Sequence, residues 1–240
     1  MKVFGPQFLL AAALVLSLAA CDSAPAKPRP VEYMLHSPYA GVRTIAVVPS
    51  FNLSPSHDFD PLVVSDLIFA ELQSVQAIHA LPVNRTLAAM TQLHMGQVRT
   101  AADAQALAAA LGADAIVVPS VTAFDPYRPP VVGMTLQLYT VKEMAPSLEP
   151  EGRQMSGQPL EHAPEPINPN QPASQVSAIF NANNQTVLLE LRDFAKGRTD
   201  YDSALQEDRY LADSEAYMRF VCHAMIRRML EVESTRVNGR

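Results

Sequence analysis

The sequence has few of the residues on which several classes of protein depend. Its 240 residues include no tryptophan, two cysteines and nine glycines. Two cysteines cannot form a disulfide scaffold or, by themselves, a zinc site. The formal charge of -6 supplies no basic surface, so nucleic-acid binding has no electrostatic support. The apolar fraction of 48% in turn excludes a chain that is disordered throughout.

Catalytic and cofactor motifs are also missing. The sequence contains no G-x-S-x-G, H-E-x-x-H or C-x-x-C motif and no Walker or dinucleotide glycine pattern. With only nine glycines, no phosphate-binding loop is evident. We therefore predict a protein that is not an enzyme and that holds no cofactor and no metal ion.

The N-terminal segment is typical of a bacterial lipoprotein signal. Residues 8–20 are apolar apart from one serine, and this run is shorter than the roughly 20 residues that a membrane-spanning helix needs. It ends in Leu18-Ala19-Ala20-Cys21, which resembles the bacterial lipobox. The resemblance implies cleavage before Cys21 and lipidation of that cysteine. The alternative is an ordinary signal peptide that happens to precede a cysteine.

Two proline-rich segments divide the rest of the chain. After the signal peptide at 1–20, residues 21–42 hold four prolines and are predicted to form a lipidated, extended tether. Residues 145–173 hold seven prolines in 29 residues, which excludes a helix or a central strand there. We expect residues 43–240 to form a single α/β domain interrupted by a flexible, exposed segment at 145–173.

Apolar runs and alternation predict the strands. Continuous apolar runs indicate buried strands at 44–49 and 115–121. Alternating apolar and polar residues at 133–141 indicate a half-buried hairpin partner after a turn at 125–130. Two weaker strands are expected at 77–83 and 175–180.

Helix start and stop signals delimit the helices. Asp60 is the expected N-cap of a helix at 61–75. Thr100 and Asp103 resemble a capping box, and Gly112 is the expected C-cap of that helix. The other predicted helices are a short one capped by Asn84, one at 186–195 and a final one from 213 or 214 to 234.

These elements predict an α/β fold with a small mixed sheet of about four strands and helices packed on it. The strands at 44–49 and 115–121 should lie in one sheet, with 131–141 antiparallel to the second of them. The C-terminal helix should pack back on the same core through Tyr217, Phe220 and Val221.

Three segments carry a family resemblance. They are "TIAVVPSF" (44–51), "DPLVVSDLIFAELQSVQAIHALPVNRTLAAM" (60–90) and "AQALAAALGADAIVVPSVTAF" (104–124). Their order resembles that of an envelope lipoprotein group containing the curli-secretion lipoprotein, LpoB and the N-terminal domain of TolB. The resemblance covers residues 43–141 and implies the soluble envelope domain of that group. It departs from the group at Pro119, where a glycine is usual. The resemblance does not extend to the pore of the curli-secretion lipoprotein, because each subunit of that pore needs two long amphipathic hairpins.

Two local clusters could carry chemistry. His57, Asp58 and Asp60 are metal-capable residues in a loop after a buried strand, but a solvated loop ending in a helix cap explains them better. Cys222 has His223 or Arg219 nearby to supply an activating cation, but a buried, inert thiol is the favoured interpretation.

The candidate partner contacts are Tyr127, Arg219 and Arg227. Tyr127 lies in the predicted hairpin turn, where a protruding aromatic ring suits a partner groove. Arg219, His223 and Arg227 recur at a spacing of four and could meet an anionic lipid or a partner. The favoured interpretation of this stripe is a solvated helix face, ion-paired with nearby glutamates.

The leading functional hypothesis is a lipid-anchored envelope protein that acts by non-enzymatic binding to other envelope components. It faces the periplasm from the inner or the outer membrane. The first alternative is a subunit of an envelope secretion or surface-assembly complex, which makes an oligomer possible. The second alternative is a lipid-anchored hydrolase whose motif is not recognisable.

Overall fold

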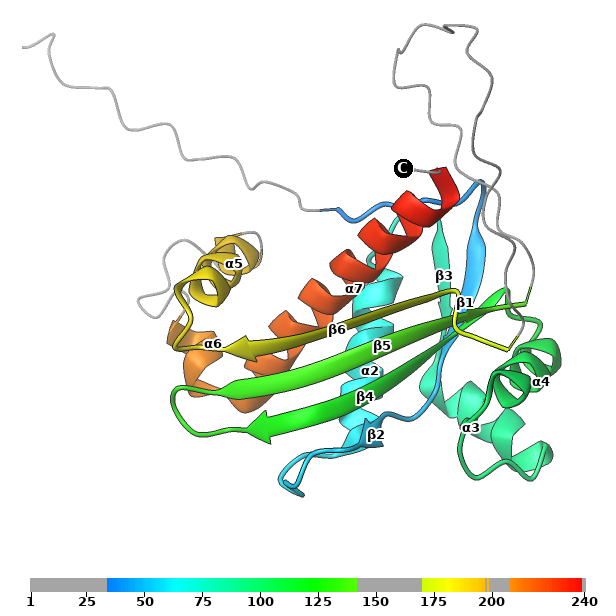
Figure 1. The fold of residues 1–240 in the computed structure, drawn as a ribbon, viewed down its shortest axis with the longest axis horizontal. Coiled ribbons are helices and arrows are strands. Elements are labelled where there is room, and N and C mark those ends of the chain that lie inside the picture. The colour runs from blue at the N-terminus through cyan, green and yellow to red at the C-terminus, as the bar shows by residue number, and fades with distance from the viewer. Residues whose placement is uncertain (1–33, 142–169, 197, 199–207, 239–240) are drawn as a thin grey trace, which may run out of the picture. The chain divides into compact units, whose positions relative to one another are not determined.

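The computed structural model describes residues 34–141, 170–196, 198 and 208–238 (Figure 1). The signal peptide, Cys21, most of the tether and nearly all of the proline-rich segment lie outside these residues. The expectations about them therefore stay predictions. Within the described ranges, no helix combines the length and the apolar character needed to cross a bilayer.

The core of the fold is one mixed sheet. Its strand order is β3-β1-β4-β5-β6, and β2 pairs with β4 beside this path. Strands β3 and β4 run parallel to β1, whereas β5 runs antiparallel to both β4 and β6. The strands are β1 (Arg43–Val47), β2 (Phe51–Asn52), β3 (Ile78–Leu81), β4 (Ala115–Asp125), β5 (Val131–Thr140) and β6 (Ser174–Asn181).

The α/β class is confirmed, but the sheet has six strands where about four were predicted. Five of the six coincide with segments that the sequence indicated as strands, including the weaker ones at 77–83 and 175–180, and β2 is the strand that was missed. Strand β2 has two residues, too few for any periodic signal in the sequence, and β3 has four.

Helices cover both faces of the sheet. They are α2 (Pro61–Gln73), α3 (Val83–Gln92), α4 (Ala101–Leu111), α5 (Gln185–Lys196), α6 (Asp208–Ala212) and α7 (Ser214–Asn238). Ile45 and Val47 of β1 point into a core built with α2 and α7. The intervening Ala46 points to the other face, into a smaller core with α3 and α4. The two layers therefore follow from the alternation of side chains along the buried strands (Figure 1).

The predicted helix caps are largely confirmed. The Asp60 side chain accepts a hydrogen bond from the Leu62 N–H at 2.8 Å. Thr100 and Asp103 form a reciprocal capping box, and Gly112 ends α4 in the left-handed region with φ 65°. Asn84 is a correction, because α3 begins at Val83 and Asn84 lies inside its first turn.

Pro82 is the residue before α3, with an extended backbone and no side-chain cap. Its φ of -62° and ψ of 144° are extended, and its side chain has no atom that could accept a hydrogen bond from the first turn.

Pro119 lies in the middle of the sheet at a position where its missing N–H costs no ladder bond. The carbonyl groups of Val117 and Val121 both accept from the side of β1 and β2, from Val48 and Leu53. Because backbone groups alternate in direction along a strand, those of Pro119 point to the same side of β4. On that side β1 has ended and β2 has not yet begun, so no ladder partner waits for an N–H. The departure from the family pattern is therefore compatible with this fold.

The last helix packs on the core, as predicted. Tyr217, Phe220 and Val221 are all buried. The Phe220 ring lies 5.7 Å from that of Phe180 on β6 and 5.6 Å from that of Phe194 on α5. Helix α7 thereby joins the sheet and α5 in one apolar cluster.

The N-terminal end of the domain is fixed to α7 by a buried polar contact. The Tyr39 hydroxyl donates to the Glu233 carboxylate at 2.6 Å, and Arg236 donates to the same carboxylate at 2.6 and 2.9 Å. Burial and the negative charge of Glu233 raise the pKa of Tyr39. Tyr39 lies within the segment predicted as tether, so packing begins before residue 43.

Candidate functional site

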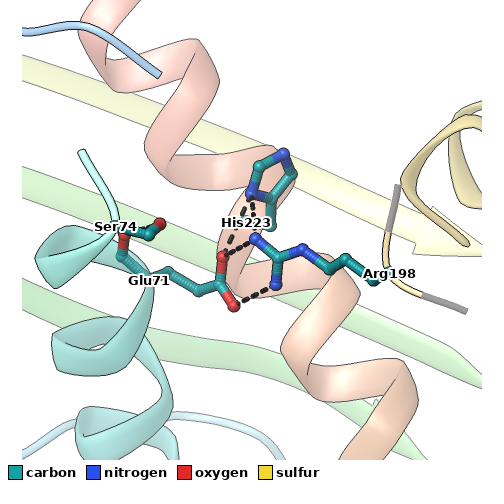
Figure 2. A network of polar contacts seen from close by, with 4 residues as sticks. All are labelled: Glu71, Ser74, Arg198 and His223. Atoms are coloured by element: carbon teal, nitrogen blue, oxygen red, sulfur yellow. Dashed lines mark hydrogen bonds and ion pairs between the residues drawn. The ribbon is translucent and has the colours of Figure 1, made fainter. Parts of the chain in front are cut away.

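A buried cluster of charged side chains connects three helices (Figure 2). Glu71 on α2 is 4% exposed. Arg198, just after α5, donates to both carboxylate oxygens of Glu71, at 2.6 and 2.7 Å. His223 on α7 places its Nδ1 atom 3.1 Å from Oε2 of Glu71. The carboxylate thus ties α2 to α7 and to the end of α5.

The contacts of Glu71 fix the proton arrangement of His223. An ionised carboxylate only accepts hydrogen bonds, so Nδ1 of His223 carries the proton that points at Oε2. Arg198 lies 3.3 Å from the same Nδ1 atom because both groups donate to one oxygen. The second ring nitrogen of His223 points away from Glu71 (Figure 2).

The partners of Glu71 keep it ionised. Burial alone raises the pKa of a carboxyl group, but hydrogen bonds from His223 and Arg198 outweigh burial and lower the pKa of Glu71. Arg198 also lies over the Phe194 ring at 4.4 Å, and that ring lies 5.0 Å from the His223 ring. The cation is therefore held by an aromatic face as well as by the carboxylate.

A pocket of about 240 Å³ opens beside this cluster. Its lining mixes cationic, acidic and aromatic side chains: Met34, Ser74, Glu190, Asp193, Phe194, Arg198, Phe220, His223, Ala224 and Arg227. A carboxylate that orients an imidazole through Nδ1 is also found in hydrolytic triads, where these two groups are joined by a nucleophilic hydroxyl or thiol. However, the Ser74 hydroxyl donates to the Glu71 backbone carbonyl at 2.6 Å. In the described part of the chain, no hydroxyl or thiol hydrogen-bonds to His223.

The charged cluster predicts a specific pH dependence. Because the pKa of Glu71 is lowered on folding, its stabilising contribution is full above the usual value of 4.5 and is lost as the pH falls through the lowered value. We expect Glu71→Gln to cost about 1–3 kcal/mol at pH 7, because Arg198 and His223 lose a charged acceptor. The measurement is denaturant unfolding of both proteins between pH 7 and pH 3.

The difference in unfolding free energy between the two proteins should shrink as the pH falls below 4.5. Glu215→Gln is the matched control, because Glu215 is exposed and should leave stability within about 0.5 kcal/mol at each pH. A difference that stays constant down to pH 3 would contradict this arrangement of charges.

Sequence reasoning missed Glu71 and misplaced His223. His223 was predicted on a solvated stripe, but it is buried against α2 and bonded to Glu71. Spacing along α7 reveals which residues share a face, but not which element covers that face. One signal was present: Glu71 interrupts an otherwise apolar helix face at Leu67, Ile68 and Leu72, which indicates a buried charge that needs a partner.

The arginines of the predicted stripe differ in their contacts. Arg227 pairs with Glu190 at 3.4 Å and with Glu231 at 3.8 Å, which agrees with the predicted pairing to Glu231. Arg219 is exposed, and among the described residues it forms no ion pair with Glu215. Partner binding by either arginine stays a prediction.

The predicted loop cluster is a capped turn beside a small pocket. Asp58 accepts a hydrogen bond from the Ser56 hydroxyl, and Asp60 is the α2 cap. Across residues 34–141, 170–196, 198 and 208–238, no group of three or more His, Cys, Asp and Glu residues is arranged to hold a metal ion. The pocket measures about 120 Å³ and is lined by Asp58, Phe59, Asp60, Val63, Val64, Leu67, Phe124, Ser214, Glu215 and Met218.

The remaining two predicted residues are placed clearly. Tyr127 lies in the turn between β4 and β5 and is 76% exposed. Cys222 is fully buried, and burial together with the negative charge of Glu71 raises the pKa of its thiol. The favoured interpretation of Cys222, a buried and unreactive residue, agrees with this environment.

Comparisons with known proteins give distant likenesses. No protein-family model matches the chain, and no curated protein matches it. The solved structure of the LpoB C-terminal domain from Salmonella enterica is 15% identical with a TM-score of 0.37, over 44% of this chain and 78% of that one. Lipoprotein GNA1162 from Neisseria meningitidis is 16% identical with a TM-score of 0.40, over 61% and 91%.

A third structure, hypothetical protein CT253 from Chlamydia trachomatis, is 11% identical with a TM-score of 0.38, over 83% of this chain and 100% of that one. The LpoB domain belongs to the group whose motifs the sequence resembles.

Proposed function

We propose that this chain is a lipid-anchored protein of the bacterial cell envelope that acts by binding other envelope components, without catalysis. The anchoring part is supported by Leu18-Ala19-Ala20-Cys21, which closes an apolar segment too short to span a bilayer. Lipid on Cys21 holds the domain at a membrane surface facing the periplasm. Two acyl chains are enough for stable anchoring.

One observation carries the binding part of the proposal: Tyr127 exposes 76% of its surface from a well-held turn. The Asp125 side chain accepts a hydrogen bond from the Tyr127 N–H at 3.1 Å. Arg128 lies 3.5 Å from Asp208 on α6. A large aromatic ring on a fixed backbone is the kind of residue that anchors protein interfaces at low entropic cost.

The small pocket at the same end of the domain indicates the chemistry of the partner. The Phe59 ring packs against the Phe124 ring at 4.9 Å, so the loop before α2 contacts the strand that leads to the Tyr127 turn. The floor of the pocket is apolar, and Asp58, Asp60 and Glu215 surround it. A partner segment with one apolar side chain flanked by Lys or Arg matches this surface.

Replacing Tyr127 tests the binding proposal. We expect Tyr127→Ala to lower recovery of the partner about tenfold or more, because truncation of an anchoring tyrosine costs about 2 kcal/mol or more. The measurement is quantitative mass spectrometry after affinity purification of the full chain from detergent-solubilised membranes.

Val42→Ala is the control for this experiment, because Val42 is exposed and lies outside the hairpin end. Alanine at both His57 and Cys222 should also leave recovery unchanged, since neither residue performs chemistry in this proposal. Equal recovery by Tyr127→Ala and the parent chain would contradict binding through this surface. A turnover abolished by His57→Ala, with the fold preserved, would overturn a function based on binding alone.

A further inference from the structure

The free edge of β6 leaves a row of backbone groups without partners. In the part of the chain that the structure describes, strand β6 ends the sheet and pairs only with β5 (Figure 1). The Ala182 N–H donates to the Pro130 carbonyl, just beyond the Phe180–Val132 pair of the ladder. Because backbone groups alternate in direction along a strand, the even-numbered residues of β6 direct theirs toward β5. Gln175, Ser177 and Ile179 therefore direct theirs outward. Among the described residues, none hydrogen-bonds to these outward groups.

Within the described residues, β6 lacks the features that usually protect an edge strand. Protective devices include charged side chains, proline, bulges and covering segments. The sequence of β6, Ser-Gln-Val-Ser-Ala-Ile-Phe-Asn, has no charge and no proline. Its register with β5 runs without interruption over eight pairs. At the opposite edge, β3 has only four residues, and His36 forms a bridge with Gln76 just before it.

The outer face of β6 adds an apolar contact to these backbone groups. Ile179 is 68% exposed, so its apolar side chain is available for contact at the edge. Beside it, Ser177 shares a hydrogen bond with Thr135 at 2.8 Å, and Gln175 accepts one from Gln137 at 2.8 Å. The side chains of this face are thus ordered by β5 and present Ile179 at the edge.

We propose that the β6 edge pairs antiparallel with β6 of a second copy of this chain, centred on Ile179, to form a two-fold dimer with one continuous sheet. Charge is the reason for choosing a second copy. The chain carries a formal charge of -6, so most approaches of two copies are repulsive. The neutral β6 edge brings no like charges face to face.

Pairing centred on Ile179 satisfies both copies at once. The outward groups of Ile179 bond to those of Ile179 in the other copy. Ser177 then lies opposite Asn181, and its carbonyl accepts from the Asn181 N–H. The Asn181 carbonyl itself already accepts from the Asn184 N–H at 2.8 Å. The two exposed isoleucine side chains cover each other on the outer face. An interface of this kind uses the same surface on both copies and closes at two, because each copy has one β6 edge.

Cysteine cross-linking tests the geometry. Residues opposite each other in a hydrogen-bonded antiparallel pair lie about 5.5 Å apart between Cα atoms, within disulfide range. We expect Ile179→Cys in the full chain, in native membranes treated with a mild oxidant, to form a disulfide dimer. Thr135→Cys is the matched control, because Thr135 lies on the same face one strand further from the edge.

The natural cysteines should contribute few disulfide dimers to this experiment. Cys222 is buried, and the parent chain with both natural cysteines gives the baseline for any contribution from Cys21. A dimer yield at 179 several times that at 135 supports the proposal. Equal yields at both positions, or no dimer at either, would overturn it. A disulfide at Ser177→Cys in preference to Ile179→Cys would overturn the register centred on Ile179.

A second measurement uses two copies of the full chain with different tags, co-expressed and purified through one tag. We expect Ile179→Lys to reduce co-purification of the other copy about tenfold or more, because lysines then lie opposite each other and apolar contact is lost. Leu189→Lys on α5 adds the same charge at another exposed apolar residue and should leave co-purification unchanged.

Ser177→Pro distinguishes pairing between two copies from the folding of each copy. The Ser177 N–H points outward, so proline there keeps the ladder with β5 but removes a donor from the free edge. We expect this variant to keep the parent melting temperature within a few degrees and to lose co-purification. Tagged copies that associate equally with Ile179→Lys and Ser177→Pro would overturn the proposal. The proposal would also be overturned if the tagged copies of the parent chain do not associate, and the variants instead lose co-purification of a different protein.

Discussion

Replacing Cys21 with serine is expected to remove the protein from the membrane or to leave its precursor uncleaved. Without the thiol there is no site for the lipid, and residues 22–240 have no comparable apolar run at their start. Two acyl chains anchor stably, whereas an unlipidated domain has no such affinity, so the shift should be close to complete. The measurement is ultracentrifugal separation of membrane and soluble envelope fractions, with mass spectrometry of the N-terminus.

Cys222→Ala is the matched control for this substitution. It removes the other cysteine, which is buried in α7, and should leave the protein in the membrane fraction. The mass of the N-terminus distinguishes a cleaved, soluble product from an uncleaved precursor. An unmodified Cys21 in the parent chain, or a mature start at another residue, would contradict lipidation.

Phe220→Ala should be the most destabilising single substitution of an aromatic residue in the core. Phe220 is 1% exposed, and its ring contacts those of Phe180, Phe194 and Tyr217. Truncating a buried phenylalanine costs about 3–5 kcal/mol, a large share of the 5–15 kcal/mol that is typical of a domain. The melting temperature should fall by roughly 10 °C, and calorimetry or circular dichroism measures it.

Two further substitutions serve as comparisons for Phe220→Ala. Phe220→Leu keeps most of the buried volume and should cost less than half as much. Arg219→Ala changes the neighbouring exposed residue and should stay within about 0.5 kcal/mol of the parent. A loss below about 1 kcal/mol for Phe220→Ala would show that α7 does not pack on β6 and α5 as described.

The elements that sequence reasoning predicts well are those with short-range causes. The Asp60 cap and the capping box of Thr100 and Asp103 join atoms no more than three residues apart. The buried strand β4 is visible because both its faces are apolar near its start. Asn84 failed as a cap because α3 already begins at Val83, which places Asn84 inside the first turn.

The candidate site was harder to predict because its contacts are long-range. Glu71 lies 127 residues from Arg198 and 152 from His223 in the sequence. A helical repeat placed Arg219, His223 and Arg227 on one stripe, but the packing of α2 against α7 decided which of them is buried. Tyr127 was easier to find, because a tyrosine between prolines in a turn has few ways to be covered.

Helix α7 covers the larger core, so a chain without it cannot complete the fold. Its 25 residues end at Asn238, and the core between the sheet and α2 stays open until they are available. A chain that lacks them has an apolar sheet face exposed to solvent, which favours aggregation over completion of the fold.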